Sequence, residues 1–539
     1  MVVFERLPAC VRDARCERGN RYGKHCLAGW RDRNIHDRHR QHDISGRHRR
    51  VACDLRQWKR DTHGHSACSH SRFNRCRYGS ARHHHHLRQH MGILDAPSLS
   101  KSVGDGRYAP LTVSRLHENA VAALGDSRTD MVSDAFISTA PTITQFAANG
   151  YLNWARFLSG QRFHFDDTLN FGKSGDTIAQ CAARVPNVIA SGVSRCFVLI
   201  GTNDLAITPI ATMIDQWTNQ IIIPLQRAGI QPIVLLEYPR VGITAYALGV
   251  KNQFNDYIRR FAQAQHAVPS SVRCILIDAQ DYMEDYAGAA GSALSDRLYD
   301  GTHPSMIGAY WLGKAISDVI TQLWPPRRFS CSPADLYDAT NNPRGILNAN
   351  PALLGTAGLL VANTGVTPTG QVATGFKLYR GAGTSTALTF TGAKENPRTD
   401  GPTSGERQRV TVNITGVGTS AETYILQPTT NPSSYIVPGA VVELSCAVQF
   451  AAAPVNLVGL ELQMAEIGPA TPHQAVDMVR QTGFKMPAIA VSGRLRTPPF
   501  QLQAGVTSIS SYVRMVFDAS GGSASGDVYF SDFQMRPVV

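Results

Sequence analysis

The sequence lacks any run of about 18 apolar residues, which argues against a segment that crosses a membrane as a helix. Charge is also scarce, because charged residues make up 17% of the chain, whereas hydrophobic residues make up 43%. That balance excludes a wholly disordered chain and supplies enough apolar material for packed domains. Since 539 residues are too many for one core, we expect two or three domains.

Two further absences concern export and cross-linking. Neither Met1 nor Met91 is followed by the basic region and apolar core of a signal peptide, so no standard secretion signal is visible. Beyond residue 90 the cysteines are scattered and odd in number, which predicts buried thiols and no disulfide framework. They are Cys181, Cys196, Cys274, Cys331 and Cys446.

The net charge of +12 is confined to the start of the chain. Residues 1–90 hold 21 Lys and Arg against 8 Asp and Glu, and they also contain 13 of the 18 histidines. The rest of the chain has a net charge of −1. A neutral body gives no basic surface for nucleic acid, so we expect no nucleic-acid partner there.

Three interpretations compete for residues 1–90, which show neither a helical nor a strand period. A basic arm for nucleic acid would lack interleaved aromatic residues. We favour a disordered segment or a wrong-frame extension of GC-rich coding sequence, with a natural start at Met91. The third interpretation, a zinc site, matches no paired Cys-x-x-Cys or Cys/His finger spacing. Its ligands would come from His63, His65, Cys68, His70 and Cys76.

Residues 118–326 alternate short apolar runs with amphipathic stretches, which is typical of parallel strands joined by crossover helices. The predicted strands are 120–124, 196–200, 232–237 and 272–277, and the predicted helices are 177–190, 210–227, 249–266 and 305–323. This pattern predicts a layered α/β domain. In such open sheets, functional sites lie just beyond the carboxyl ends of the strands.

A serine follows the first predicted strand, in the tripeptide Gly125-Asp126-Ser127. Gly125 permits a tight turn, and the amides after it can point at an anion. Most Gly-Asp-Ser sequences are plain turns, so the motif needs partners to indicate catalysis.

A base and a carboxylate precede the last predicted helix, in Asp300-Gly301-Thr302-His303-Pro304. A serine hydroxyl becomes a good nucleophile when an imidazole takes its proton, and a carboxylate can hold the other ring nitrogen. The spacing of three residues lets one turn of chain deliver both groups. A lone histidine more often caps a helix or lies on the surface, but only five histidines follow residue 90. We therefore favour a catalytic triad of Ser127, Asp300 and His303.

Two more glycine-containing turns supply donors for an oxyanion, the negative charge that develops during acyl transfer. Asn170 to Thr177 is a turn at a helix start, in which the amide of Gly175 is a natural donor. Gly201-Thr202-Asn203-Asp204 ends a strand with an asparagine whose side chain can donate. Either turn alone is more often a plain turn or cap. Asp204 we expect to hold a loop.

These four blocks, in this order, resemble those of the SGNH (GDSL-like) hydrolase superfamily, and the resemblance covers residues 118–326. It implies a three-layer α/β/α flavodoxin-like fold and hydrolysis of esters or thioesters, including acetyl groups on sugars, without metal or cofactor. It also implies that Ser127 is the nucleophile and one oxyanion donor, with Gly175 and Asn203 as the others. No Gly-x-Ser-x-Gly elbow is present to favour an ordinary α/β-hydrolase.

After a predicted linker at 327–344, residues 345–539 are rich in Thr, Val, Gly and Ser with short alternating runs, which predicts a β-sandwich. The beginning and end of this region resemble those of jelly-roll carbohydrate-binding modules. A structural or oligomerising β domain is the alternative. Exposed aromatic residues would favour glycan binding. The candidates are Tyr379, Tyr424, Tyr435 and Phe450.

The predicted connector at 91–117 contains residues 102–111, which resemble connectors of bacteriophage tail proteins. With no visible secretion signal, this favours a virion-borne enzyme that meets an external glycan. We therefore predict a serine esterase that removes O-acetyl groups from a carbohydrate or polysaccharide through an acyl-enzyme. The alternatives are a short-chain lipid esterase or thioesterase acting on a small acylated molecule, and a non-catalytic glycan-binding tail protein.

Overall fold

The computed structural model describes residues 119–133, 143–327, 329, 331–395, 405–432, 437–450 and 452–538. These residues all fall within 101–539, which form one compact unit. The predicted segment 1–90, with its zinc and nucleic-acid interpretations, the whole predicted connector 91–117 and residue 118 lie outside the described residues.

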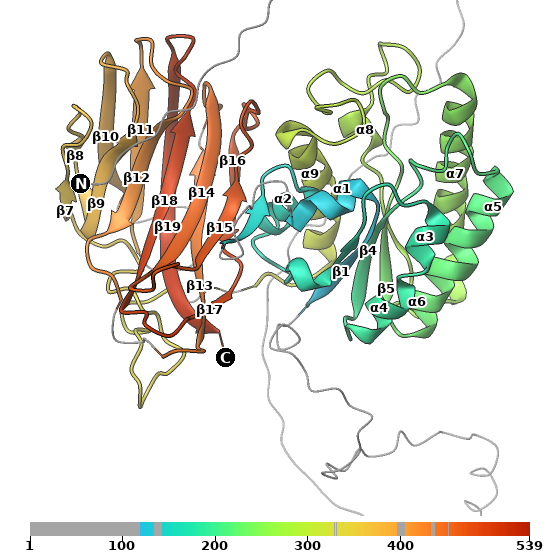
Figure 1. Ribbon diagram of the computed structural model, residues 1–539, viewed down its shortest axis with the longest axis horizontal. Helices are drawn as coiled ribbons and strands as arrows, with labels where there is room; N and C mark the ends of the chain where they lie inside the picture. The colour runs from blue at the N-terminus through green and yellow to red at the C-terminus, as the bar shows by residue number, and fades with distance from the viewer. Residues whose placement is uncertain are drawn as a thin grey trace, which may run out of the picture. The chain divides into compact units, whose positions relative to one another are not determined.

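The first part of the described chain is a five-stranded parallel sheet with helices on both faces (Figure 1). Its spatial order is β3-β1-β4-β5-β6. The strands are β1 (Val121–Gly125), β3 (Asn170–Gly172), β4 (Arg195–Leu199), β5 (Gln231–Leu235) and β6 (Ile275–Ile277). Counted along the chain, these strands take the order 2-1-3-4-5 of flavodoxin-like sheets. The predicted α/β fold is therefore confirmed.

The predicted strands are present because their apolar runs are buried on both faces, as in parallel sheets that helices cover. Val121 to Leu124 of β1 are fully buried, and so are Cys196 to Leu199 of β4. The last predicted strand is shorter than expected. It begins at Ile275, because the amides of Val272 and Arg273 both donate to the carbonyl of Pro269 in a turn.

The helices pack in two groups, with α2 and α9 together on one side of the sheet and α3, α5, α6 and α7 on the other (Figure 1). The predicted helix 177–190 is two helices, and Pro186 stands in the first turn of the second, where proline is favoured. The predicted helix 210–227 is continuous but passes through a π-helical segment, Gln216–Ile222. The α-helices are α1 (Ser127–Asp130), α2 (Tyr151–Leu158), α3 (Ile178–Ala182), α4 (Val185–Ala190), α5 (Ile210–Asp215), α6 (Ile223–Arg227), α7 (Ala245–Ala264), α8 (Gln280–Met283) and α9 (Met306–Leu323).

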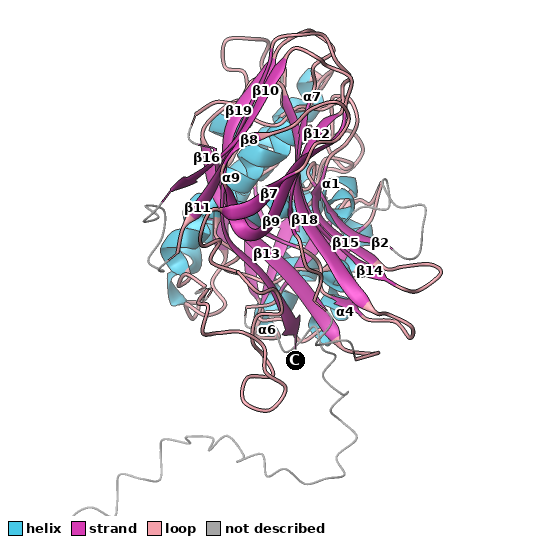
Figure 2. Cartoon of the chain, turned by 90° about the vertical axis from the view of Figure 1, so that its left-hand side faces the viewer, coloured by secondary structure: helices cyan, strands magenta, loops and turns pink. Residues whose placement is uncertain are grey.

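The second part of the described chain is a β-sandwich, as predicted. Figure 2 shows its strands in two layers, one with β10, β11, β16 and β19 and one with β12, β14, β15 and β18. The first sheet contains β8 (Thr369–Gly370), β10 (Leu388–Glu395), β11 (Arg407–Ile414), β13 (Val441–Phe450), β16 (Val491–Arg496), β17 (Phe500–Gln501) and β19 (Ala524–Val538). The second contains β2 (Ile143–Ala147), β7 (Ala357–Leu360), β9 (Val372–Ala382), β12 (Glu422–Pro428), β14 (Leu457–Ile467), β15 (Gln474–Val479) and β18 (Ser508–Phe517).

Strand β2 connects the two parts of the chain in an unexpected way. It lies between β1 and α2 in sequence, yet it pairs with β15 of the sandwich in parallel, from Ile143 beside Gln474 to Ala147 beside Val479. The contact continues beyond the strand, because Gln161 Nε2 donates to the carbonyl of Arg494 at 2.7 Å. The α/β layer thus contributes an edge strand to the sandwich.

The predicted linker 327–344 is also held to the sandwich. Leu336 and Ile346 form an isolated β-bridge, as do Asp338 and Asn342. Asp335 forms an ion pair with Arg536 of β19 at 2.5 Å.

A buried carboxylate at the junction of the two parts predicts a pH-dependent stability. Asp477 of β15 is 2% exposed, and burial raises the pKa of its carboxyl to about 6, although Arg156 of α2 opposes the shift. The native protein holds this proton up to about pH 6, whereas the unfolded chain loses it near pH 4. The native state therefore binds more protons in this window, and its stability falls as pH rises through it.

Across that window we expect Asp477 to lower the free energy of unfolding by up to about 3 kcal/mol. Urea unfolding at pH values between 4 and 7 measures this effect. Subtracting the profile of Asp477→Asn separates the contribution of Asp477 from that of other groups that titrate nearby, such as His164. Parallel profiles for the two proteins would show that Asp477 has no raised pKa.

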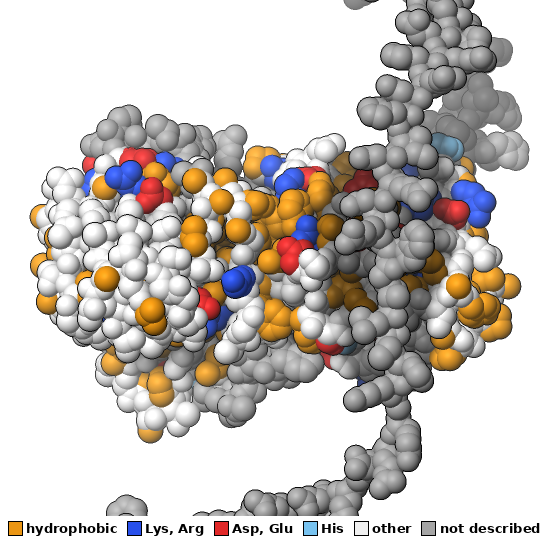
Figure 3. Space-filling view, turned by 90° about the horizontal axis from the view of Figure 1, so that it is seen from above, with side chains coloured by type: hydrophobic (Ala, Val, Ile, Leu, Met, Phe, Trp, Pro, Cys, Tyr) orange, Lys and Arg blue, Asp and Glu red, His pale blue; other side chains and the backbone are white. Residues whose placement is uncertain are grey.

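The surface carries both charge signs in small groups. Figure 3 shows Lys and Arg side chains beside Asp and Glu side chains, with hydrophobic side chains between them, on the part of this face that the described residues form. This distribution fits the net charge of −1 beyond residue 90. Within the described part of the chain, no helix has the length and apolar character that crossing a membrane requires.

Candidate active site

Ser127 lies directly beyond the carboxyl end of β1, as the first residue of α1. A side chain at Gly125 would meet Thr129 Oγ1 at 2.3 Å and the carbonyl of Leu199 at 2.4 Å, so only glycine fits where β1 ends. Asp126 caps the helix by accepting a hydrogen bond from the amide of Arg128. The backbone therefore turns sharply at this point and leaves the Ser127 hydroxyl at the sheet edge.

A buried cluster of charged side chains holds this turn in place. Arg128 donates to both carboxylate oxygens of Asp126, at 2.9 and 2.6 Å, and to both of Glu237, at 2.8 and 2.7 Å. All three side chains are at most 1% exposed. Burial alone would lower the pKa of Arg128, but its two carboxylate partners outweigh that effect and raise the pKa. The guanidinium thus ties the turn that carries Ser127 to the end of β5.

Asp300 and His303 lie on the loop before α9. Asp300 Oδ1 accepts hydrogen bonds from the amides of Thr302 and His303, at 2.9 and 2.8 Å. Partial burial would raise the pKa of Asp300, but these donors and the His303 ring hold it below its usual value. The loop is fixed from outside as well, because the amide of Val241 donates to the carbonyl of Gly301 at 2.7 Å.

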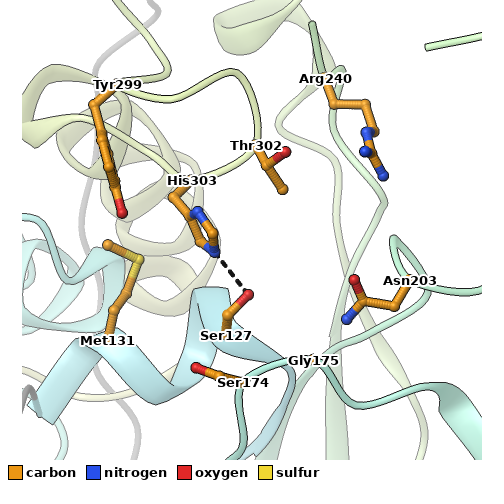
Figure 4. Close-up of a pocket in the computed structure, with 9 residues that line it drawn as sticks. All are labelled: Ser127, Met131, Ser174, Gly175, Asn203, Arg240, Tyr299, Thr302 and His303. Carbon is orange, nitrogen blue, oxygen red and sulfur yellow. Dashed lines mark hydrogen bonds between the residues drawn. The ribbon is translucent and has the colours of Figure 1, made fainter. Parts of the chain in front are cut away.

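The three residues meet in one chain of hydrogen bonds, of which Figure 4 shows the one between His303 and Ser127. His303 Nε2 lies 2.7 Å from Ser127 Oγ, and His303 Nδ1 lies 2.6 Å from Asp300 Oδ2. The Nδ1 atom donates to the carboxylate, which leaves Nε2 free to accept the serine proton. Residues 176 positions apart in sequence are thereby brought within hydrogen-bonding distance.

The two expected oxyanion loops lie beside Ser127, in the lower part of the pocket in Figure 4. Gly175 has a φ of +83°, and a side chain there would meet nothing within 4 Å, so its loop is open on this side. Asn203 Nδ2 donates to the carbonyl of Asp176 at 2.9 Å, which ties the two loops together. Since the amide group has two hydrogens, one remains for a ligand.

Asp204 holds the same two loops from the buried side. Its Oδ2 accepts from the amide of Ile178 at 2.9 Å, and its Oδ1 accepts from Thr208 Oγ1 at 2.9 Å. Desolvation raises the pKa of this carboxyl, although the two donors oppose the shift. Asp204 is 1% exposed and therefore links loops without reaching the pocket.

A pocket of about 370 Å³ opens between these loops. It is lined by Ser127, Met131, Ser174, Gly175, Asn203, Arg240, Tyr299, Thr302 and His303. Sequence reasoning singled out four of these residues and missed the others as wall residues. One signal could have found Arg240, because it follows β5 closely and so stands beyond the carboxyl end of a strand.

Tyr299 forms one wall of the pocket and connects it to the sandwich. Its ring is stacked against that of His303, with centroids 5.8 Å apart, and the residue is 44% exposed. Phe484, from the chain between β15 and β16, contacts Tyr299 edge-to-face, with ring centroids 5.5 Å apart. The sandwich therefore contributes a residue to the support of the His303 loop.

The aromatic candidates for glycan binding in the sandwich differ in their exposure. Tyr424 and Phe450 are buried in its core, Tyr379 is partly exposed, and Tyr435 lies outside the described residues. Glycan binding by this part stays a prediction. In the described part of the chain, no group of three or more His, Cys, Asp and Glu residues is arranged to hold a metal ion.

Comparisons with known proteins give matches for the first part of the chain. Residues 123–310 match the model of the GDSL-like Lipase/Acylhydrolase family. No curated protein matches the sequence.

Three similar solved structures each cover 38% of this chain. A member of the lipolytic protein G-D-S-L family from Veillonella parvula is 17% identical, with 100% of its chain covered and a TM-score of 0.29. A GDSL-like lipase from Bacteroides thetaiotaomicron is 16% identical, with 89% covered and a TM-score of 0.29. A family 3 carbohydrate esterase from Clostridium thermocellum is 19% identical, with 98% covered and a TM-score of 0.29.

Proposed function

We propose that residues 123–310, which match the GDSL-like Lipase/Acylhydrolase family model, form a carboxylic-ester hydrolase that removes O-acetyl groups from a carbohydrate through an acyl-enzyme on Ser127. The observation that carries this proposal is the chain of hydrogen bonds from Ser127 Oγ through the His303 ring to Asp300, at 2.7 and 2.6 Å. Both distances are those at which a proton passes directly between heavy atoms.

In the first half-reaction, Ser127 Oγ attacks the ester carbonyl carbon while its proton passes to His303 Nε2. Asp300 holds the ring in the required orientation and stabilises the imidazolium that forms. The carbonyl oxygen becomes an oxyanion. The amides of Ser127 and Gly175 and the side-chain amide of Asn203 donate to it. When the tetrahedral intermediate collapses, the alcohol leaves with the proton from His303, and the acyl group stays on Ser127.

In the second half-reaction, water replaces the alcohol. His303 Nε2 takes a proton from the water as its oxygen attacks the acyl carbon, and the same donors hold the new oxyanion. The acid leaves, and Ser127 Oγ recovers a proton from His303.

The lining of the pocket favours a short acyl group on a polar alcohol. Ser174, Thr302, Asn203 and Arg240 present polar groups, and Met131 is the aliphatic side chain among the residues that line it. The Tyr299 ring, which is 44% exposed, forms an aromatic part of the wall beside these polar groups. A long acyl chain would need an extended apolar wall.

The test compares p-nitrophenyl esters of two, four and eight acyl carbons with an O-acetylated polysaccharide, from which released acetate is measured. We expect the highest kcat/KM on the acetyl ester and steady acetate release from the polysaccharide. The highest kcat/KM on the eight-carbon ester would instead identify a lipid esterase. Hydrolysis of none of these substrates would favour the non-catalytic glycan-binding alternative.

Removal of one oxyanion donor should slow the chemical step. Asn203→Ala is expected to lower kcat on p-nitrophenyl acetate by about 10²- to 10³-fold with a small change in KM, because the lost hydrogen bond strengthens as the oxyanion forms. Steady-state kinetics measures both constants. Thermal unfolding serves as the control, since Asn203 also ties its loop to Asp176. A rise in KM at unchanged kcat would contradict this role.

A further inference from the structure

Arg240 is a cationic side chain in the lining of the pocket, and nothing in the proposed chemistry uses it. It lies across the pocket from His303, and in Figure 4 its guanidinium points toward the space above Asn203. Its Nη1 donates to the carbonyl of Thr202 at 3.3 Å. A guanidinium has five N–H donors, so most of its capacity for hydrogen bonds remains for a ligand.

The charge of Arg240 is not neutralised by the residues around it. Some arginines of this domain face carboxylates, as Arg128 faces Asp126 and Arg259 faces Asp278. Within the described residues, no Asp or Glu oxygen lies within 4 Å of Arg240. No Asp or Glu lines the pocket either. A half-buried cation without a counter-ion attracts an anionic group into the cavity it faces.

We propose that Arg240 binds a carboxylate on the alcohol part of the substrate, so that the preferred ester is an acetylated acidic sugar. A planar guanidinium matches a carboxylate in a paired hydrogen-bond geometry that the ammonium of lysine cannot form. The inference rests on the proposed esterase function, because the ester and the carboxylate must occupy the same pocket. It adds a substrate class and a specificity-determining residue to that function.

A different role for Arg240 would be purely structural, through its hydrogen bond to Thr202 in the loop that carries Asn203. The two roles have different consequences. A structural role makes Arg240 equally important for every ester, whereas carboxylate binding makes it important for anionic esters alone.

The experiment uses two aryl acetates of nearly the same shape, 4-acetoxybenzoate and 4-acetoxybenzamide, with the full-length protein. The readout is the ratio of their kcat/KM values, in which the intrinsic reactivity of each ester cancels between protein variants. We expect Arg240→Gln to lower this ratio by about 10- to 100-fold, as for the loss of a charged hydrogen bond. Arg240→Lys should retain part of the preference, and added salt should reduce that of the wild type.

Arg259→Gln is the matched control, because it removes the same charge from the exposed side of α7. Its ratio should equal that of the wild type. An equal loss on both esters in Arg240→Gln, or an unchanged ratio, would overturn the proposal.

If the wild type hydrolyses neither ester, the esterase proposal fails, and a binding measurement decides the role of Arg240 independently. Binding of 4-hydroxybenzoate and 4-hydroxybenzamide to Ser127→Ala is then compared by NMR titration. Stronger binding of the carboxylate that disappears in the double variant Ser127→Ala/Arg240→Gln supports the proposal. Equal binding of both compounds, or of neither, overturns it.

Discussion

Ser127→Ala is expected to lower kcat on p-nitrophenyl acetate by about 10⁴- to 10⁶-fold, because no other group can form the acyl-enzyme. His303 Nε2 loses the hydroxyl that lies 2.7 Å away, so the ring has no proton to accept. Residual hydrolysis would come from water activated by His303 and from the oxyanion donors. Burst and steady-state measurements of p-nitrophenol release give this loss directly.

A matched serine provides the control. Ser191 lies at the end of α4, where its hydroxyl donates to the carbonyl of Val188, so Ser191→Ala should keep the wild-type kcat. Covalent labelling adds an independent readout. A fluorophosphonate should modify the wild type on the peptide that contains Ser127 and should leave Ser127→Ala unlabelled. Equal kcat values for the wild type and Ser127→Ala would end the acyl-enzyme proposal.

Arg128→Met is expected to destabilise the fold by about 3–5 kcal/mol, because it leaves two buried carboxylates without a counter-charge. Asp126 and Glu237 are each at most 1% exposed, so water cannot replace the guanidinium. Urea unfolding of the wild type and the variant at one pH measures this loss.

The control for this prediction is an arginine whose ion pair is more exposed. Arg259 pairs with Asp278 at 2.8 Å, and the two side chains are 30% and 41% exposed to water. Because such surface pairs contribute about 0–1 kcal/mol, Arg259→Met should have a small effect. If Arg128→Met were as stable as Arg259→Met, the buried cluster would not support the turn that carries Ser127.

The parallel sheet could be predicted because its strands are continuous apolar runs, which a single sequence displays. β1 and β4 are of this kind, and their ends place Ser127 and Asn203 at one edge. The motif residues could be grouped for the same reason, since each follows a strand or precedes a helix. The short strand β3 could not be found this way, because three residues carry no readable period.

Features that depend on distant partners were outside the reach of sequence patterns. Arg128 looks like an ordinary polar residue after Ser127 until Glu237, 109 positions later, is placed beside it. The same holds for Tyr299, whose contact with Phe484 crosses from the α/β layer to the sandwich. The pocket walls therefore had to come from the three-dimensional arrangement.

The pairing of β2 with β15 of the sandwich also decides where this chain can be divided. A fragment of residues 345–539 would leave one side of β15 with unpaired amides and carbonyls, because β2 covers that side in the intact protein. Such an edge invites other strands to bind, so the isolated fragment should tend to aggregate. Neither part of this protein can be transplanted whole by a single cut, and any study of the sandwich alone must supply the missing strand.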